Sequence, residues 1–120
     1  MITIATLSQA TPQQVFNQVA RHLLRQRAKS KAIFNGETIC AYRGEGGLRC
    51  AAGCLVSDTE MLAYHVPNNC GWYNLCELTG IWAHYELISA LQDLHDLNDP
   101  IDWQLKLIEF AESNGLEPLQ

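Results

Sequence analysis

The chain has 120 residues and a formal net charge of −5, and 48% of its residues are hydrophobic. A chain of this length forms one domain with a core of its own. It has no apolar run of the ~18 residues needed to span a bilayer, and its first residues lack the basic and long apolar stretches of a signal peptide. We therefore expect a single domain over residues 1–120, in the cytoplasm, without a membrane partner.

The charges are divided unevenly along the chain. Seven of the eight Lys and Arg residues lie in residues 1–49, and eleven of the thirteen acidic residues lie in residues 50–120. The acidic half repels phosphates, and the basic segment 21–31 has no aromatic residue on which a base could stack. The sequence therefore argues against nucleic acid as a partner.

The first two predicted elements are a lead-in and a helix. Residues 1–10 are expected to be extended, and the alternation around Ile4 is consistent with a short edge strand. The next element is a helix over residues 11–30. Thr11 can cap it, Pro12 suits its first turn, and Gln14 completes a capping box.

A β-hairpin is predicted over residues 38–52. Residues 38–43 alternate in polarity, the Gly-Glu-Gly-Gly sequence at 44–47 can turn the chain, and residues 48–52 return. A hairpin alone is marginally stable in water, so it must lie on the helices.

The remaining elements are mainly helical. Ser57 and Glu60 form a capping box for a short helix, Pro67 and its neighbours indicate a loop, and Asp99 and Pro100 separate two longer helices. The predicted ranges are 57–63 for the short helix, 64–80 for the loop, and 81–97 and 100–114 for the two helices. The fold class is α+β: a mainly helical domain with a central two- or three-stranded antiparallel hairpin sheet packed on three to four helices.

Cysteine spacing bears on metal and redox chemistry. The chain has five cysteines and no sign of secretion, so reduced thiols are expected. No Cys-x-x-Cys pair occurs, and the spacing of Cys50 and Cys54 is a weak match to a zinc site. We expect no metal and no cofactor.

A nucleophilic site is one hypothesis for the segment around Cys50. That thiol follows the glycine-rich turn, and His95 beside Asp96 completes the minimum for a Cys–His hydrolase. His95, however, shares an apolar stripe with Leu91, which is typical of a core histidine. We expect Cys50 and His95 to lie close, with His95 and Asp96 bonded to backbone in or near the turn Cys50–Gly53.

An anion site is a second hypothesis. The glycine-rich turn is flanked by two arginines, and backbone N–H groups with guanidiniums can hold a phosphate or carboxylate. The candidate residues for a small anionic ligand or nucleotide are Tyr42, Arg43, Gly46, Gly47 and Arg49. The alternative is an ordinary turn with solvated arginines.

The segment CAYRGEGGLRCAAGCLVSD at 40–58, followed by LQDLHD at 91–96, resembles small proteins of tailed bacteriophages and prophages. The resemblance covers about residues 13–116, and that family has no settled activity. Structural motif positions that match it are Cys40, Cys50, Gly53, Asp58, Gln92, His95 and Asp96. Segment 65–80 departs from the pattern.

The resemblance implies a function in host takeover or in countering host defence. Small phage accessory proteins of this kind act mostly by binding, so the expected partner is a host protein in the bacterial cytoplasm. The acidic half of this chain would supply the surface, by complementarity to a basic partner. The sequence therefore favours binding over catalysis.

Overall fold

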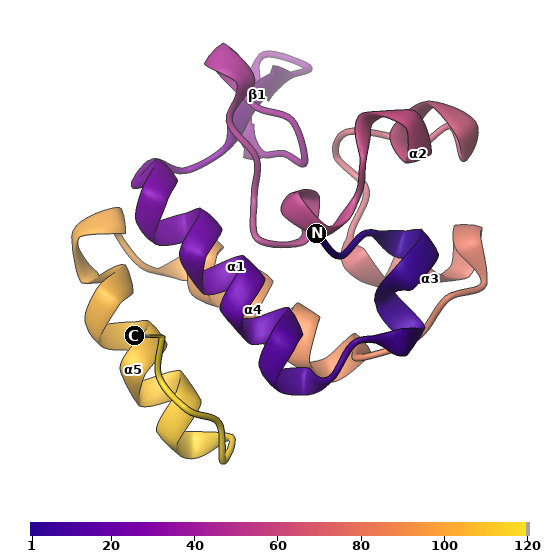
Figure 1. Ribbon diagram of the computed structural model, residues 1–120. Helices are drawn as coiled ribbons and strands as arrows, with labels where there is room; N and C mark the ends of the chain where they lie inside the picture. Colours follow the sequence, from indigo (N-terminus) through magenta and orange to yellow (C-terminus); the bar gives the residue numbers. More distant parts are fainter. Residues whose placement is uncertain (120) are drawn as a thin grey trace.

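The computed structural model describes residues 1–119, except for the side chain of Phe34. It confirms a mainly helical α+β domain with one two-stranded antiparallel sheet. Helices α1 (Pro12–Gln26), α4 (Tyr85–Leu97) and α5 (Trp103–Ser113) contact one another and form the body of the fold (Figure 1). None of the helices within residues 1–119 is long and apolar enough to cross a membrane.

The N-terminal segment is helical, which corrects the predicted extended lead-in. It forms a 3₁₀ helix, η1 (Ile4–Gln9), with Ile4 and Leu7 both buried. The three-residue spacing of these two side chains equals one 3₁₀ turn, so both reach the same face. Glu60 fixes the segment, because its carboxylate accepts the Ile4 and Ala5 backbone N–H groups at 3.2 and 2.9 Å.

Helix α1 begins where the sequence predicted and ends earlier. Thr11 and Gln14 form the expected capping box. The helix ends at Gln26 rather than at residue 30, because Arg27 takes a left-handed conformation with φ of 52°. Beyond it the chain is held by tertiary contacts, notably those of the fully buried Ser30.

The hairpin lies earlier in the chain than predicted. Strands β1 (Lys31–Phe34) and β2 (Glu37–Cys40) pair antiparallel around the turn Asn35–Gly36, where both residues have positive φ. Asn-Gly is the strongest short hairpin signal, because such a turn needs two left-handed residues. Between the two predicted strands, 38–43 and 48–52, the pairing is reduced to a single bridge between Arg43 and Arg49.

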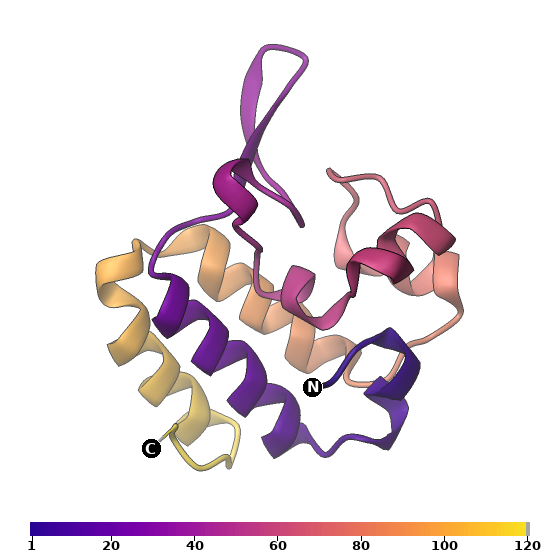
Figure 2. The ribbon, with the colours of Figure 1, turned by 45° about the horizontal axis from the view of Figure 1, so that its top comes forward.

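The hairpin stands out from the body rather than at its centre (Figure 2). Its outer end is solvated, with Ile33 69% exposed. Ser30 closes its base, because the Ser30 hydroxyl donates to the Ala41 carbonyl at 2.5 Å, and it fixes that base to α4, because the Ser30 N–H donates to His95 at 3.2 Å. The elements around residues 41–56 thus lie between the hairpin and the helices.

The second half of the chain contains one more helix than predicted. Helix α2 (Asp58–Ala63) begins with the predicted Ser57–Glu60 capping box. The predicted loop 64–80 contains α3 (Trp72–Thr79), which ends at Gly80 with φ of 74°. Residues 81–84 are a connection, so α4 is shorter than the predicted 81–97, and a 3₁₀ turn, η4 (Pro100–Asp102), precedes α5.

Candidate functional site

The segment from Cys40 to Asp58 is folded around one guanidinium. Arg43 donates to the carbonyls of Tyr42, Gly53 and Val56 at 3.2, 2.8 and 2.5 Å, and its Nε lies 2.9 Å from the Asp58 carboxylate. A guanidinium has five N–H donors in a rigid planar fork, so it can reach several separated acceptors at once, which a compact ammonium does less well. Arg43 is therefore a structural clamp for this segment and is not free to hold the predicted anion.

Gly53 has a packing reason to be glycine. A Cβ at this position would lie 2.6 Å from the Tyr42 carbonyl oxygen and 3.2 Å from Cys50 Sγ. Residues 42 and 53 therefore approach each other so closely that there is no room for a side chain at position 53. The short helix that contains Gly53, η3 (Ala52–Leu55), is fully buried and contacts α1 and α4.

The remaining members of the predicted anion site do not converge. Gly46 and Gly47 form the tip of the loop in the short 3₁₀ helix η2 (Glu45–Gly47), both with positive φ. Tyr42 points inward and is 3% exposed. Only Arg49 presents its side chain to solvent, at 3.4 Å from the exposed Asp58 carboxylate.

His95 joins α4 to the base of the hairpin. The ring is fully buried and stacks on Trp103, with ring centroids 5.3 Å apart. Its Nε2 faces the Ser30 backbone N–H at 3.2 Å, and its Nδ1 faces Asp96 Oδ1 at 2.7 Å. Because a backbone N–H can only donate, Nε2 accepts and Nδ1 carries the proton that bonds Asp96.

The contact between α4 and the Cys50–Gly53 turn is made by Gln92. Its Oε1 accepts the Ala52 N–H at 2.9 Å, and its Nε2 donates to Asp96 Oδ1 at 2.8 Å. His95 was expected to bond this turn, and its backbone partner is Ser30 instead. The predicted connection between the two motifs is present, with different residues in contact.

Cys50 is not placed as a nucleophile. Burial raises the pKa of its thiol to about 12, although Sγ accepts the Gly53 N–H at 3.2 Å. A nucleophilic cysteine needs a thiolate near neutral pH and a base with a free nitrogen. Both ring nitrogens of His95 are hydrogen-bonded to groups other than Cys50. Cys50 and His95 therefore contribute to the fold and do not form a nucleophile with its base.

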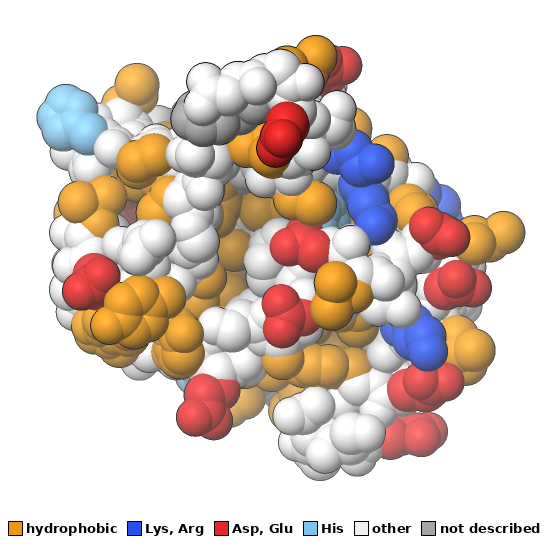
Figure 3. Space-filling view, turned by 180° about the vertical axis from the view of Figure 1, so that it is seen from behind, with side chains coloured by type: hydrophobic (Ala, Val, Ile, Leu, Met, Phe, Trp, Pro, Cys, Tyr) orange, Lys and Arg blue, Asp and Glu red, His pale blue; other side chains and the backbone are white. Residues whose placement is uncertain are grey.

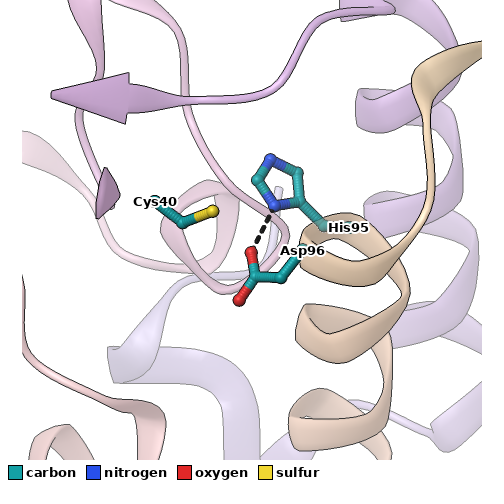
Figure 4. A group of neighbouring side chains, drawn as sticks. All are labelled: Cys40, His95 and Asp96. Atoms are coloured by element: carbon teal, nitrogen blue, oxygen red, sulfur yellow. Dashed lines mark hydrogen bonds and ion pairs between the residues drawn. The ribbon is translucent and has the colours of Figure 1, made fainter. Parts of the chain in front are cut away.

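Cys40, His95 and Asp96 form the closest group of potential metal ligands in residues 1–119 (Figure 4). One ligand atom from each lies within 4.8 Å of the others. Binding through Nδ1 would move its proton to Nε2, which already faces the Ser30 N–H. Burial and the nearby Asp96 carboxylate raise the pKa of Cys40, which also favours the protonated thiol. The group therefore fits a hydrogen-bonded network better than a metal site.

A cavity of about 190 Å³ lies beside this network. Its lining includes three thiols, those of Cys40, Cys50 and Cys70, together with Tyr42 and Trp72. The Tyr42 hydroxyl and the Trp72 indole N–H are buried and make no hydrogen bond to the described residues. Burial, with the neighbouring cysteines, raises the pKa of Tyr42, so the hydroxyl stays protonated.

Replacing Tyr42 by Phe should leave the free energy of unfolding unchanged or raise it. A buried hydroxyl without a partner carries a desolvation cost of about 1–3 kcal/mol, which the substitution removes while keeping the ring. Urea unfolding of the two proteins, with equal m-values, measures the difference. A loss of more than about 1 kcal/mol would show that the hydroxyl has a partner in solution.

The outer side of α5 and the turn before it carry an apolar row. Ile101, Leu105 and Ile108 follow one another at spacings of four and three residues, so they share a face. Ile101 is 86% and Leu105 58% exposed, while Trp103, Leu107 and Ala111 of the same helix face the core. We call this row and its acidic neighbours the α5 face; the acidic members are Asp102, Glu109 and Glu112.

This surface was not predicted from the sequence. Residues 101, 105 and 108 recur with helical spacing opposite Trp103, Leu107 and Ala111, and that second period was the available signal.

Acidic and hydrophobic side chains alternate along the edge of the molecule where the α4–α5 connection reaches the surface (Figure 3).

No family model matches the sequence, and no curated protein or solved structure matches it either. The resemblance to small phage proteins therefore stays a prediction.

Proposed function

We propose that this protein acts by binding a partner protein through the α5 face. The observation that carries the proposal is the exposed row of large aliphatic side chains at Ile101, Leu105 and Ile108, which are 86%, 58% and 37% exposed. Contiguous exposed apolar patches are uncommon on monomeric proteins, and they commonly mark interaction sites.

Charge indicates the kind of partner. Asp102 and Glu109 are the i−3 and i+4 neighbours of Leu105, and Glu112 is the i+4 neighbour of Ile108, so acids border the row. Glu109 pairs with Lys106 at 3.7 Å, whereas Asp102 and Glu112 make no ion pair within residues 1–119. Interfaces pair an apolar centre with complementary charges at the rim. The proposed partner therefore presents an apolar groove bordered by Lys or Arg. On the resemblance to phage accessory proteins, it would be a host protein in the bacterial cytoplasm, such as a component of host defence.

Catalysis is the weaker reading of this geometry. The Cys50 thiol is protonated at neutral pH, and His95 uses both nitrogens in contacts within the fold. Binding needs only the exposed surface that the α5 face provides. We therefore propose a binding protein rather than a hydrolase.

A double variant, Ile101→Ser with Leu105→Ser, should abolish partner capture and leave the fold intact. Exposed side chains outside special contacts change stability by only about 0.5 kcal/mol when replaced. Immobilised protein is incubated with bacterial lysate at low and high salt, and captured proteins are identified by mass spectrometry. We expect the parent chain to capture one host protein at low salt and less of that protein at high salt. The double variant should not capture it.

The matched control is Leu62→Ser, because Leu62 is a 76% exposed aliphatic side chain on α2, outside the α5 face. It should capture the same protein as the parent. Equal capture by all three proteins, or none by the parent at low salt, would contradict the proposal. The oligomeric state of the parent alone is measured by sedimentation. A dimer that the double variant does not form would mean that the α5 face binds a second copy of this chain.

A further inference from the structure

A basic pocket lies between α1 and the segment that contains Arg49. Its volume is about 340 Å³, and its lining includes Arg21, His22, Arg25 and Arg49. No carboxylate is among the described residues that line it. Three guanidiniums thus share one concave site in a protein whose net charge is negative.

Helix α1 fixes the position of Arg49. Gln26 Oε1 accepts the Arg49 backbone N–H at 2.9 Å, and Gln26 Nε2 donates to the Arg49 carbonyl at 2.8 Å. His22 Nε2 donates to the same carbonyl at 2.9 Å. The backbone of Arg49 is therefore held beside α1 at three points, so this wall of the pocket is in place before a ligand arrives.

The charges of this pocket are poorly neutralised within the fold. Arg21 and Arg25 are exposed, lie four residues apart on one helix and make no ion pair within residues 1–119. Arg49 has one ionic partner, the exposed Asp58, at 3.4 Å. Like charges at this spacing destabilise a helix, so the cluster is better suited to a bound anion than to the free protein.

We propose that this pocket binds a small phosphorylated ligand, with Arg21, Arg25 and Arg49 donating to the phosphate oxygens. Guanidiniums form paired, charge-assisted hydrogen bonds to phosphate. The pocket is near the lower end of the volume range of ligand sites, which limits the ligand to about the size of a mononucleotide. The site shares no residue with the α5 face.

The ligand is tested by calorimetric titration and thermal shift at constant ionic strength. The probes are inorganic phosphate, AMP and adenosine, with sodium chloride as the ionic control. We expect phosphate and AMP to bind and to raise the melting temperature, and adenosine and chloride to do neither. Tighter binding of AMP than of phosphate would indicate a nucleotide, and equal binding a phosphoryl group alone. Binding of AMP and adenosine with equal affinity would overturn the proposal.

Variants locate the site. Arg21→Gln and Arg49→Gln should each weaken phosphate binding on the order of 10- to 100-fold, the equivalent of one charge-assisted hydrogen bond. Arg27→Gln is the matched control, since it removes the same charge from the same end of α1 without lining the pocket. Without phosphate, the melting temperature of the Arg21→Gln variant should be no lower than that of the parent, because Arg21 makes no ion pair within residues 1–119. Equal weakening by Arg27→Gln, or binding of a long single-stranded RNA but of neither phosphate nor AMP, would overturn the proposal.

Discussion

Replacing His95 by Ala is expected to lower the free energy of unfolding by about 3–5 kcal/mol, as for other large buried rings. The change leaves a cavity against Trp103, removes the partner of the Ser30 N–H, and leaves Gln92 as the remaining side-chain partner of the Asp96 carboxylate among the described residues. Urea unfolding followed by tryptophan fluorescence measures the loss. Because the free energy of unfolding of a small domain is only about 5–15 kcal/mol, the expected loss is a large part of the total stability.

Two further variants separate packing from hydrogen bonding. His95→Phe keeps the buried ring beside Trp103 and should recover part of the loss, while the Ser30 N–H remains unpaired. It also keeps the test informative if the Ala variant does not fold. His65→Asn is the control, because His65 is an exposed histidine at a φ of 52° that Asn tolerates. A loss below about 1 kcal/mol in His95→Ala would refute the assigned connection between α4 and the hairpin base.

Replacing Arg43 by Ala should cost about 2–4 kcal/mol, since hydrogen bonds to charged groups contribute about 1.5–3 kcal/mol and unsatisfied acceptors add to the loss. One guanidinium serves the carbonyls of Tyr42, Gly53 and Val56, and its removal frees all three. Arg43→Lys should recover little, because an ammonium cannot reach the three acceptors together. Thermal and urea unfolding provide the measurement.

Arg49→Ala is the comparison that distinguishes a clamp from a pair of solvated arginines. Its side chain has one partner among the described residues, the exposed Asp58, and such pairs stabilise little. The change should therefore leave stability nearly unaltered. Equal losses for Arg43→Ala and Arg49→Ala would mean that both arginines serve the same purpose.

The two arginines show why the sequence placed an anion site at the wrong position. Arg43 and Arg49 both flank the glycine-rich turn, and nothing local separates them. The Arg43 side chain turns toward backbone carbonyls up to 13 residues away in sequence, whereas Arg49 is held by its backbone to Gln26 of α1, more than 20 residues earlier. These directions depend on how the segment packs on the helices, so spacing alone could not predict them.

His95 was predicted more successfully. Its place on the apolar stripe of a late helix indicated a buried histidine bonded to backbone, and the ring is fully buried and accepts from a backbone N–H. The particular partner, Ser30, could not be predicted because it lies 65 residues away. The hairpin was misplaced for a local reason: the glycine-rich sequence at 44–47 was interpreted as its turn, and Asn35–Gly36 makes the turn instead.

The sequence by itself determined the start of α1 at Thr11, the capping box of Ser57 and Glu60, and the mainly helical α+β class. Caps and helical periodicity depend on residues three or four positions apart, so they are visible in the chain. Only the tertiary structure decided that the Cys40–Asp58 segment is held by Arg43 and that Arg49 joins α1. Long side chains choose among distant partners, and that choice is made when the elements pack.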